Sequence, residues 1–418
     1  MLQNFKVFTD ISELVTLKGA AERQGRRVRE EDLSVIPNAT LVCLNGRVVW
    51  AGGSSELTSS MLTPWGGERA ATQVSLGGRS VLPGFVECHT HLVFAGSRVQ
   101  EFEWRVQGQT YQEIAAKGGG IRSTVEQTRR AGVEELRALA QARADRFSRQ
   151  GVTTLEIKSG YGLDLVTEAR ALEVARALRG PRIVTTYLGA HSRSPELPDF
   201  DDYVNEMCEK TLPEIAARKL ADRADIYVEK GFFTPTHARQ YLRKARALGL
   251  GLTAHVEQLS SSGGADAALE FEPQSLDHLV FASDATIAKL ATRATVAVLL
   301  PASDLYLRMQ YPRARVMIDA GVSVALSTDF NPGTSPTQDL SLVGVLARLE
   351  MKMTLPEVIS GLTTGAARAL GALDRDSLQP GKLCDFVTLD GSWRELFYSI
   401  GNHPVAASYR AGEQITYK

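Results

Sequence analysis

The chain has 418 residues, more than one hydrophobic core usually supports, so a large domain with a smaller companion is expected. Its 47 basic and 48 acidic residues nearly cancel, and this balance argues against nucleic acid or an anionic membrane as a partner. The four cysteines form no C-x-x-C pair, and no stretch approaches the roughly 18 apolar residues of a membrane span. We therefore expect a cytoplasmic protein that acts on a small molecule, with neither a disulfide framework nor a zinc knuckle.

A hairpin is predicted near the start of the chain. Residues 39–52, ATLVCLNGRVVWAG, alternate apolar and polar side chains on both sides of the Asn45-Gly46 pair. That pair is typical of a two-residue turn between antiparallel strands. The N-terminal segment, residues 1–80, is therefore assigned to a small β domain.

Residues 81–375 are assigned to a barrel domain, because from about residue 81 to 330 short β-rich runs alternate with helical segments. Two helices are well marked: 133–149 is apolar on one face, and 165–178 stops before Gly180-Pro181. Eight β-rich runs predict a (β/α)₈ TIM barrel, and a doubly wound open sheet is the competing architecture. The runs are VLPGFV before Glu87, GVTTLEI from Gly151, RIVTTYL from Arg182, ADIYVE from Ala224, GLTA from Gly251, SLDH from Ser275, TVAVLL from Thr295 and GVSVALS from Gly321.

The C-terminal segment, residues 376–418, again has the pattern of strands, over 385–389 and 406–417. Half-buried strands need neighbours to pair with. The two chain ends are therefore predicted to meet in one small composite β-sandwich beside the barrel.

Five of the seven histidines fall at or just beyond the C-terminal ends of predicted strands. In barrel enzymes this rim holds the active site, because its loops gather side chains from strands distant in sequence. His237 opens a helix and His403 lies in the C-terminal segment, so both are excluded from the site. The five rim histidines are His89, His91, His191, His255 and His278.

A metal site is predicted among these residues. His89 and His91 follow an apolar strand, and the period of two in a strand puts both imidazoles on one side of the chain. His255 on the fifth strand and Asp329 after the eighth add a third imidazole and a carboxylate. Singly, His255 could be a core histidine and Asp329 a turn cap. Together the four predict one divalent transition metal per chain, Zn²⁺ or Fe²⁺, with room left for water.

Longer motifs carry a family resemblance. The H-x-H strand and the late aspartate are features of the amidohydrolase superfamily, whereas FAGSR, KSGYG and DFNPGTSP are more specific. Through these motifs the chain resembles the imidazolonepropionase family over nearly its whole length, which implies His89, His91, His255 and Asp329 as metal ligands and a homodimer. The segments are LPGFVECHTHLVFAGSR, GGGI from Gly118, EIKSGYGL, YLGAH, AHVEQLS and STDFNPGTSP.

The resemblance also implies an activity, hydrolysis of the ring amide of 4-imidazolone-5-propanoate to N-formimidoyl-L-glutamate in histidine degradation, by a metal-activated water. The chemistry of the side chains agrees: Arg98 offers a donor fork to a carboxylate, and Tyr161 offers a hydroxyl between two glycines. The residues implied around substrate and product are Arg98, Tyr161, His191, Gln258, Asn331, Gly333 and Thr334.

For catalysis, Asp329 can take a proton from the water, and His278 can orient the water or stabilise the oxyanion as its counterpart does in related amidohydrolases. The sequence leaves the identity of the base open. Some deaminase relatives carry a glutamate three residues beyond the strand-five histidine, where this chain has Gln258. Glu257 should face the other way, so Gln258 is expected to position substrate or water.

Two-metal relatives bridge their ions with a carboxylated lysine on the fourth strand. Here Lys158 ends the second strand and Lys230 follows the fourth, so a single metal ion is favoured. Two alternatives share the fold: an aminohydrolase acting on a nucleobase or similar ring, and a catalytically silent barrel in which the metal is structural. Gln258 and Arg98 argue against the first, and a ligand set without cysteine argues against the second.

Overall fold

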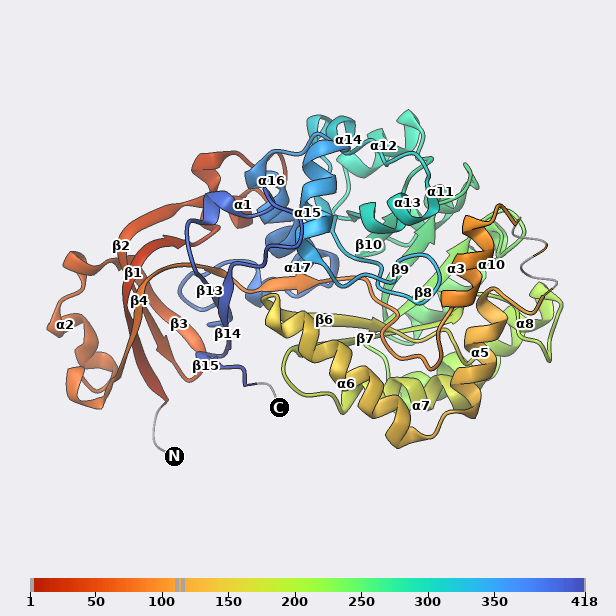
Figure 1. Ribbon diagram of the computed structural model, residues 1–418, viewed down its shortest axis with the longest axis horizontal. Helices are drawn as coiled ribbons and strands as arrows, with labels where there is room; N and C mark the ends of the chain where they lie inside the picture. The colour runs from red at the N-terminus through yellow and green to blue at the C-terminus, as the bar shows by residue number, and fades with distance from the viewer. Residues whose placement is uncertain (1–3, 110–112, 114–116, 417–418) are drawn as a thin grey trace.

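The computed structural model describes residues 4–109, 113 and 117–416 of the chain. A parallel sheet of eight strands curves into a barrel, and a mixed sheet of seven strands is built from both chain ends (Figure 1). Neighbouring barrel strands follow each other in chain order, from β5 to β12, whereas a doubly wound sheet reverses its order at one point. The predicted TIM barrel is therefore confirmed and the doubly wound alternative is wrong.

The eight barrel strands correspond to the eight predicted runs. Their bounds are β5 Phe85–Glu87, β6 Val152–Lys158, β7 Arg182–Ala190, β8 Arg223–Val228, β9 Gly251–Val256, β10 Ser275–His278, β11 Val296–Leu299 and β12 Val324–Leu326. The barrel closes just beyond β5 and β12, where Thr90 and Phe330 form a parallel bridge and the His91 backbone N–H donates to the Phe330 carbonyl at 2.9 Å. This seam brings the H-x-H segment against the segment that carries Asp329.

Helices surround the barrel (Figure 1). The predicted helix 133–149 is α6 and the predicted helix 165–178 is α7, which ends two residues earlier than expected. The helices of this domain are α3 Val99–Val106, α5 Ile121–Arg130, α6 Val133–Arg149, α7 Leu165–Arg176, α8 Phe200–Glu206, α9 Leu212–Ala217, α10 Pro235–Ala247, α11 Gly264–Leu269, α12 Asp284–Ala291, α13 Pro301–Leu307, α14 Ala314–Ala320, α15 Leu340–Leu349, α16 Leu355–Ser360 and α17 Ala366–Ala369. Two short helices, α1 Lys18–Glu22 and α2 Ser59–Leu62, belong to the N-terminal segment.

The seven-stranded sheet has the order β15-β14-β13-β4-β1-β2-β3, so C-terminal strands continue a sheet that N-terminal strands begin. The composite domain is thereby confirmed, and its strands join as one mixed sheet. The predicted turn at Asn45-Gly46 links β2 to β3 with φ of 50° and 80°, the positive values that such a turn requires. The strands are β1 Phe5–Val15, β2 Val35–Leu44, β3 Arg47–Gly53, β4 Thr72–Pro83, β13 Phe386–Leu389, β14 Val405–Arg410 and β15 Glu413–Gln414.

The largest apolar core lies between the barrel strands and their helices. Leu155 and Ile157 of β6 belong to it, together with Leu136 and Phe147 of α6. The intervening residues of β6, Glu156 among them, are buried as well. Because successive side chains of a strand point to opposite faces, these polar residues must line the inside of the barrel. No helix in the described part of the chain is both long and apolar enough to cross a membrane.

Candidate metal centre and active site

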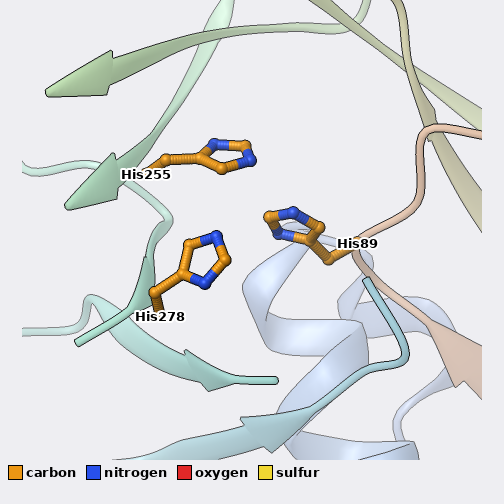
Figure 2. A group of neighbouring side chains, drawn as sticks. All are labelled: His89, His255 and His278. Atoms are coloured by element: carbon orange, nitrogen blue, oxygen red, sulfur yellow. The ribbon is translucent and has the colours of Figure 1, made fainter. Parts of the chain in front are cut away.

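The predicted ligands gather at the rim formed by the C-terminal ends of the barrel strands. His89 and His91 follow β5, His255 lies near the end of β9, and Asp329 follows β12. All four are at most 3% exposed. Figure 2 shows the rings of His89, His255 and His278, from three different strand ends, turned towards a common space. The site is therefore assembled by the barrel from residues up to 240 positions apart, the separation of His89 and Asp329.

The distances between these groups fit a metal ion. Nε2 of His89 and Nε2 of His91 each lie 3.4 Å from Oδ1 of Asp329. The rings of His89 and His255 are 4.5 Å apart, and possible ligand atoms of His89, His255 and His278 lie within 4.8 Å of one another. Nε2 of His89 and of His255 is buried with no hydrogen-bond partner in the described chain. Buried imidazole nitrogens without a partner are what a divalent transition metal would satisfy, and Asp329 adds a carboxylate oxygen 3.4 Å from one of them.

The protonation states also suit a cation. Burial raises the pKa of Asp329, but the imidazoles of His89 and His91, each 3.4 Å from its carboxylate, hold that pKa well below its usual value. Burial lowers the pKa of His255 well below normal and that of His278 to about 4. Metal ligation requires an ionised carboxylate and neutral imidazoles, and these three groups meet that requirement at neutral pH.

His89 differs from the other histidines. Burial and the charge of Lys158 lower its pKa, yet the hydrogen bond to Asp277 and the nearby carboxylate of Asp329 outweigh them and raise the pKa to about 9. The position between two carboxylates thus attracts positive charge, which either a proton or a metal ion can supply.

Three residues at the strand ends have left-handed backbone. Glu257, His278 and Asp329 have φ of 53°, 77° and 53°, which is uncommon for residues other than glycine. Each strand therefore turns sharply just after reaching the rim. Such backbone is concentrated at functional sites, because the surrounding structure must hold it in place.

Tyr161 and His191 lie beside the metal ligands. The His191 ring stacks on His91 at 4.9 Å and 18°, and the Tyr161 ring lies 5.5 Å from His191. The loop that carries Tyr161 is anchored by buried Glu168, whose carboxylate accepts the backbone N–H groups of Gly160 and Gly162 at 2.8 and 2.7 Å. Glu168 was not predicted, and it explains how a tyrosine between two glycines keeps a defined position.

Arg98 is already engaged on one edge of its guanidinium. Its Nε donates to Glu101 Oε2 at 2.9 Å, and Nη2 donates to the other carboxylate oxygen. Nη1 lies over Gly333, where an added Cβ would come within 1.9 Å of it. The predicted donor fork is thus shared: one edge holds Glu101, and Nη1 has no hydrogen-bond partner among the described residues.

The Asn331 turn bonds within itself. Oδ1 of Asn331 accepts the N–H groups of Gly333 and Thr334 at 2.8 and 2.7 Å, and Nδ2 donates to the Asp329 carbonyl at 2.7 Å. The backbone N–H groups of Gly333 and Thr334, two of the residues implied around the product, therefore already bond to Asn331. The Asn331 side chain also joins the turn to the Asp329 backbone, and Nη1 of Arg98 lies against Gly333.

Gln258 is buried, at 7% exposure, and follows the left-handed residue Glu257. Glu257 faces away from the rim, as predicted: its carboxylate accepts N–H groups of Ser262 and Ala265 at 2.8 and 3.2 Å, at the start of α11. The reason differs from the prediction, because the extended backbone ends at Val256.

Four charged residues inside the barrel were not assigned to the site from the sequence. Asp277 accepts from Nδ1 of His89 at 2.7 Å, and Asp225 lies 3.0 Å from Nδ1 of His255. Lys158, treated only as the residue that ends a strand, is fully buried among carboxylates, whereas Lys230 is exposed. Alternating polar residues within buried strands were the signal that could have revealed them. The four are Glu156, Lys158, Asp225 and Asp277.

Comparison with known proteins agrees with this class of site. The model of the amidohydrolase family matches residues 80–415. Among solved structures, an adenosine deaminase from Xanthomonas campestris with bound zinc aligns over 98% of this chain and 92% of its own, with TM-score 0.68 and 17% identity. An Aspergillus niger ochratoxinase aligns over 99% and 96%, with TM-score 0.71 and 17% identity. At these identities the structures support the fold alone. The chain belongs to the amidohydrolase family.

Curated relatives narrow this assignment. Imidazolonepropionase of Bdellovibrio bacteriovorus is 49% identical over 407 residues, which cover 97% of this chain and 95% of the relative. Imidazolonepropionase of Bacillus velezensis is 43% identical and covers 91% and 89%, and that of Porphyromonas gingivalis is 38% identical and covers 97% and 96%. Within the amidohydrolases, the chain is a member of the imidazolonepropionase family, and the resemblance seen in its motifs is confirmed.

Proposed function

We propose that this chain hydrolyses the ring amide of 4-imidazolone-5-propanoate to N-formimidoyl-L-glutamate in histidine degradation, with one divalent transition metal ion, Zn²⁺ or Fe²⁺. The observation that carries the proposal is the convergence of His89, His91, His255 and Asp329 at one barrel rim. Relatives named imidazolonepropionase at up to 49% identity support the choice of substrate.

The four predicted ligands would hold the ion through three imidazole nitrogens and one carboxylate oxygen, donor atoms that suit Zn²⁺ or Fe²⁺. When bound, the ion lowers the pKa of a coordinated water towards neutrality and polarises the substrate carbonyl. The protein residues must then orient the substrate and move the protons.

Asp329 is the proposed proton carrier. Its carboxylate stays ionised at neutral pH, since His89 and His91 hold its pKa low, so it can take the proton that the attacking water releases. The ring C–N bond breaks as Asp329 returns this proton to the departing nitrogen. His278 is neutral at pH 7, and its imidazole can orient the water or donate a hydrogen bond to the carbonyl oxygen as negative charge develops there.

The substrate would lie over the stacked rings of His91 and His191. Nη1 of Arg98 is the proposed partner of the propionate carboxylate, and the Tyr161 hydroxyl is a second donor. Burial raises the pKa of Tyr161 above its usual value, so this hydroxyl keeps its proton in the physiological range. Gln258 is proposed to position substrate or water, and the turn of Asn331, Gly333 and Thr334 to border the product.

Ring opening of 4-imidazolone-5-propanoate by the purified, metal-loaded protein tests this function. Guanine and cytosine serve as controls, because a nucleobase aminohydrolase would share the metal site. The proposal expects ring opening and no ammonia release from either base. Deamination of a nucleobase without ring opening would favour the aminohydrolase alternative.

Location and assembly are part of the same proposal. All four cysteines are buried free thiols, which suits a reducing compartment such as the cytoplasm. A homodimer is proposed from the family resemblance, and sedimentation analysis of the purified protein decides it. The proposed partner is a small-molecule substrate, with neither nucleic acid nor a membrane required.

A further inference from the structure

A cluster of buried charges lies inside the barrel next to the metal ligands, and we call it the inner charge cluster. It consists of Glu156 and Lys158 of β6, Asp225 of β8 and Asp277 of β10, and each residue is 0% exposed. Three carboxylates and one ammonium group thus share a space without solvent. Charges are rarely buried unless they are paired, so the cluster calls for an explanation beyond packing.

Lys158 is at the centre of this cluster. Its Nζ lies 2.9 Å from Asp225 Oδ2, 2.9 Å from Glu156 Oε1 and 3.6 Å from Asp277 Oδ2. Burial lowers the pKa of Lys158, but Asp225, Glu156 and Asp277 outweigh burial and raise it, so the ammonium keeps its charge.

Two of these carboxylates reach the predicted metal ligands. Asp277 Oδ2 lies 2.7 Å from Nδ1 of His89, and Asp225 Oδ1 lies 3.1 Å from Nδ1 of His255. A carboxylate that accepts the Nδ1 proton of a histidine fixes the tautomer and leaves Nε2 free to bind a metal. In both histidines Nε2 is the buried nitrogen with no partner in the described chain.

Loss of the ammonium would disturb both pairs at once. Asp225 and Asp277 would then lie near Glu156 as buried negative charges without the cation that now lies between them, and their mutual repulsion would move them apart. A carboxylate that has moved no longer accepts a histidine proton in the same geometry. Orientation of the two imidazoles therefore depends on a residue that touches neither of them.

We propose that Lys158 is a positioning residue of the metal centre, whose ammonium group holds two carboxylates in place and thereby orients His89 and His255 towards the ion. The inference rests on the proposed metal site. It extends that proposal from the ligands to the charge that organises them, and it assigns Lys158 a role without contact to substrate.

Zinc affinity tests this role without the use of substrate. The dissociation constant of the Lys158→Met variant is measured by competition with a chromogenic chelator, and we expect binding about 10- to 100-fold weaker than in the wild type. The visible absorption of the Co²⁺-loaded variant should also change, because two ligands lose their fixed orientation. Unchanged zinc affinity and an unchanged Co²⁺ spectrum in a folded Lys158→Met protein would overturn the proposal.

Arg223→Met is the matched control. Arg223 is another buried cation of the barrel interior: it donates to the side chains of Gln274 and Ser275, and its Nη1 lies 4.0 Å from Glu156 Oε1. Within the described residues no ion pair joins it to Asp225 or Asp277, the two carboxylates that reach the metal ligands. Its replacement also removes a buried positive charge, yet the proposal expects zinc affinity close to that of the wild type. An equal loss of affinity in both variants would mean that any buried charge of the barrel matters, and would contradict a specific role for Lys158.

Lys158→Met could fail to fold, because it leaves excess negative charge in the barrel. The double variant Lys158→Met/Asp225→Asn removes one charge of each sign and is compared with Asp225→Asn alone. The proposal expects weaker zinc binding in the double variant, since Asp277 also loses its cation, and equal affinities would contradict it. Ring opening is assayed separately, so an inactive wild type that binds zinc would refute the proposed function but leave this result standing.

Discussion

Replacement of Arg98 by lysine should weaken substrate binding while the metal stays bound. Arg98 uses Nε and Nη2 for Glu101 and keeps Nη1 over Gly333 for the substrate. A lysine has one ammonium group, which cannot pair with Glu101 and reach the propionate at the same time. The variant should therefore lose one charged hydrogen bond to substrate, worth about 1.5–3 kcal/mol.

That loss corresponds to a KM raised about ten- to a hundredfold, at roughly 1.4 kcal/mol per factor of ten, with kcat nearly unchanged. Steady-state ring-opening kinetics and metal analysis measure both effects. Arg105→Lys is the matched control, because Arg105 contacts Glu101 and the Gly333 carbonyl through one nitrogen, Nη2, which an ammonium can replace. A KM for Arg98→Lys equal to that of the wild type would refute this placement of the propionate.

Three further substitutions test other parts of the site. His255→Ala should abolish turnover and lower the metal content found by elemental analysis. An equal loss of activity in the folded His403→Ala control would contradict the assignment of the active site to this rim. Gln258→Glu adds a carboxylate, so the pH–rate profile should gain a titration, and an unchanged profile and KM would place Gln258 outside the site. Burial, and then the charge of His91, lowers the pKa of His191 to about 3. His191 therefore stays neutral above that pH, and His191→Asn should raise KM without moving the acid limb; a shifted limb would contradict this.

Much of the fold could be predicted because local signals agreed with the final structure. The Asn45-Gly46 pair marks its turn through residues that tolerate positive φ. The helix 133–149 is bounded by a clear apolar face and matches α6 at both ends. The strand order of a closed barrel then follows from the count of eight βα units, since successive units lie side by side.

The rim histidines could also be located from the sequence, but the inner charge cluster could not. All residues of β6, VTTLEIK, are buried, so burial does not distinguish the face towards the helices from the face inside the barrel. Glu156 and Lys158 are two residues apart and therefore point into the barrel together. Their partners Asp225 and Asp277 come from other strands, so pairing depends on the barrel register, which no local pattern contains.

The substrate-facing loops show a similar limit. Arg98 was predicted as a free donor fork, although Glu101 stands three residues later, a spacing that can pair two side chains within a helical turn. Asn331, Gly333 and Thr334 are predicted around the product, but the Asn331 side chain accepts the backbone N–H of Gly333, as asparagine commonly does two residues ahead. Residue type indicates candidate segments, whereas the donors left for a ligand depend on packing that the sequence does not show.

Reconstitution of the metal-free protein tests the central claim most directly. The protein is stripped with a chelator and titrated with Zn²⁺ or with Fe²⁺ under anaerobic conditions, while bound metal and ring-opening rate are measured on the same samples. Activity is expected to rise in proportion to bound metal and to reach its maximum at one ion per chain. Full activity in the stripped protein, or a maximum only at two ions per chain, would contradict the account.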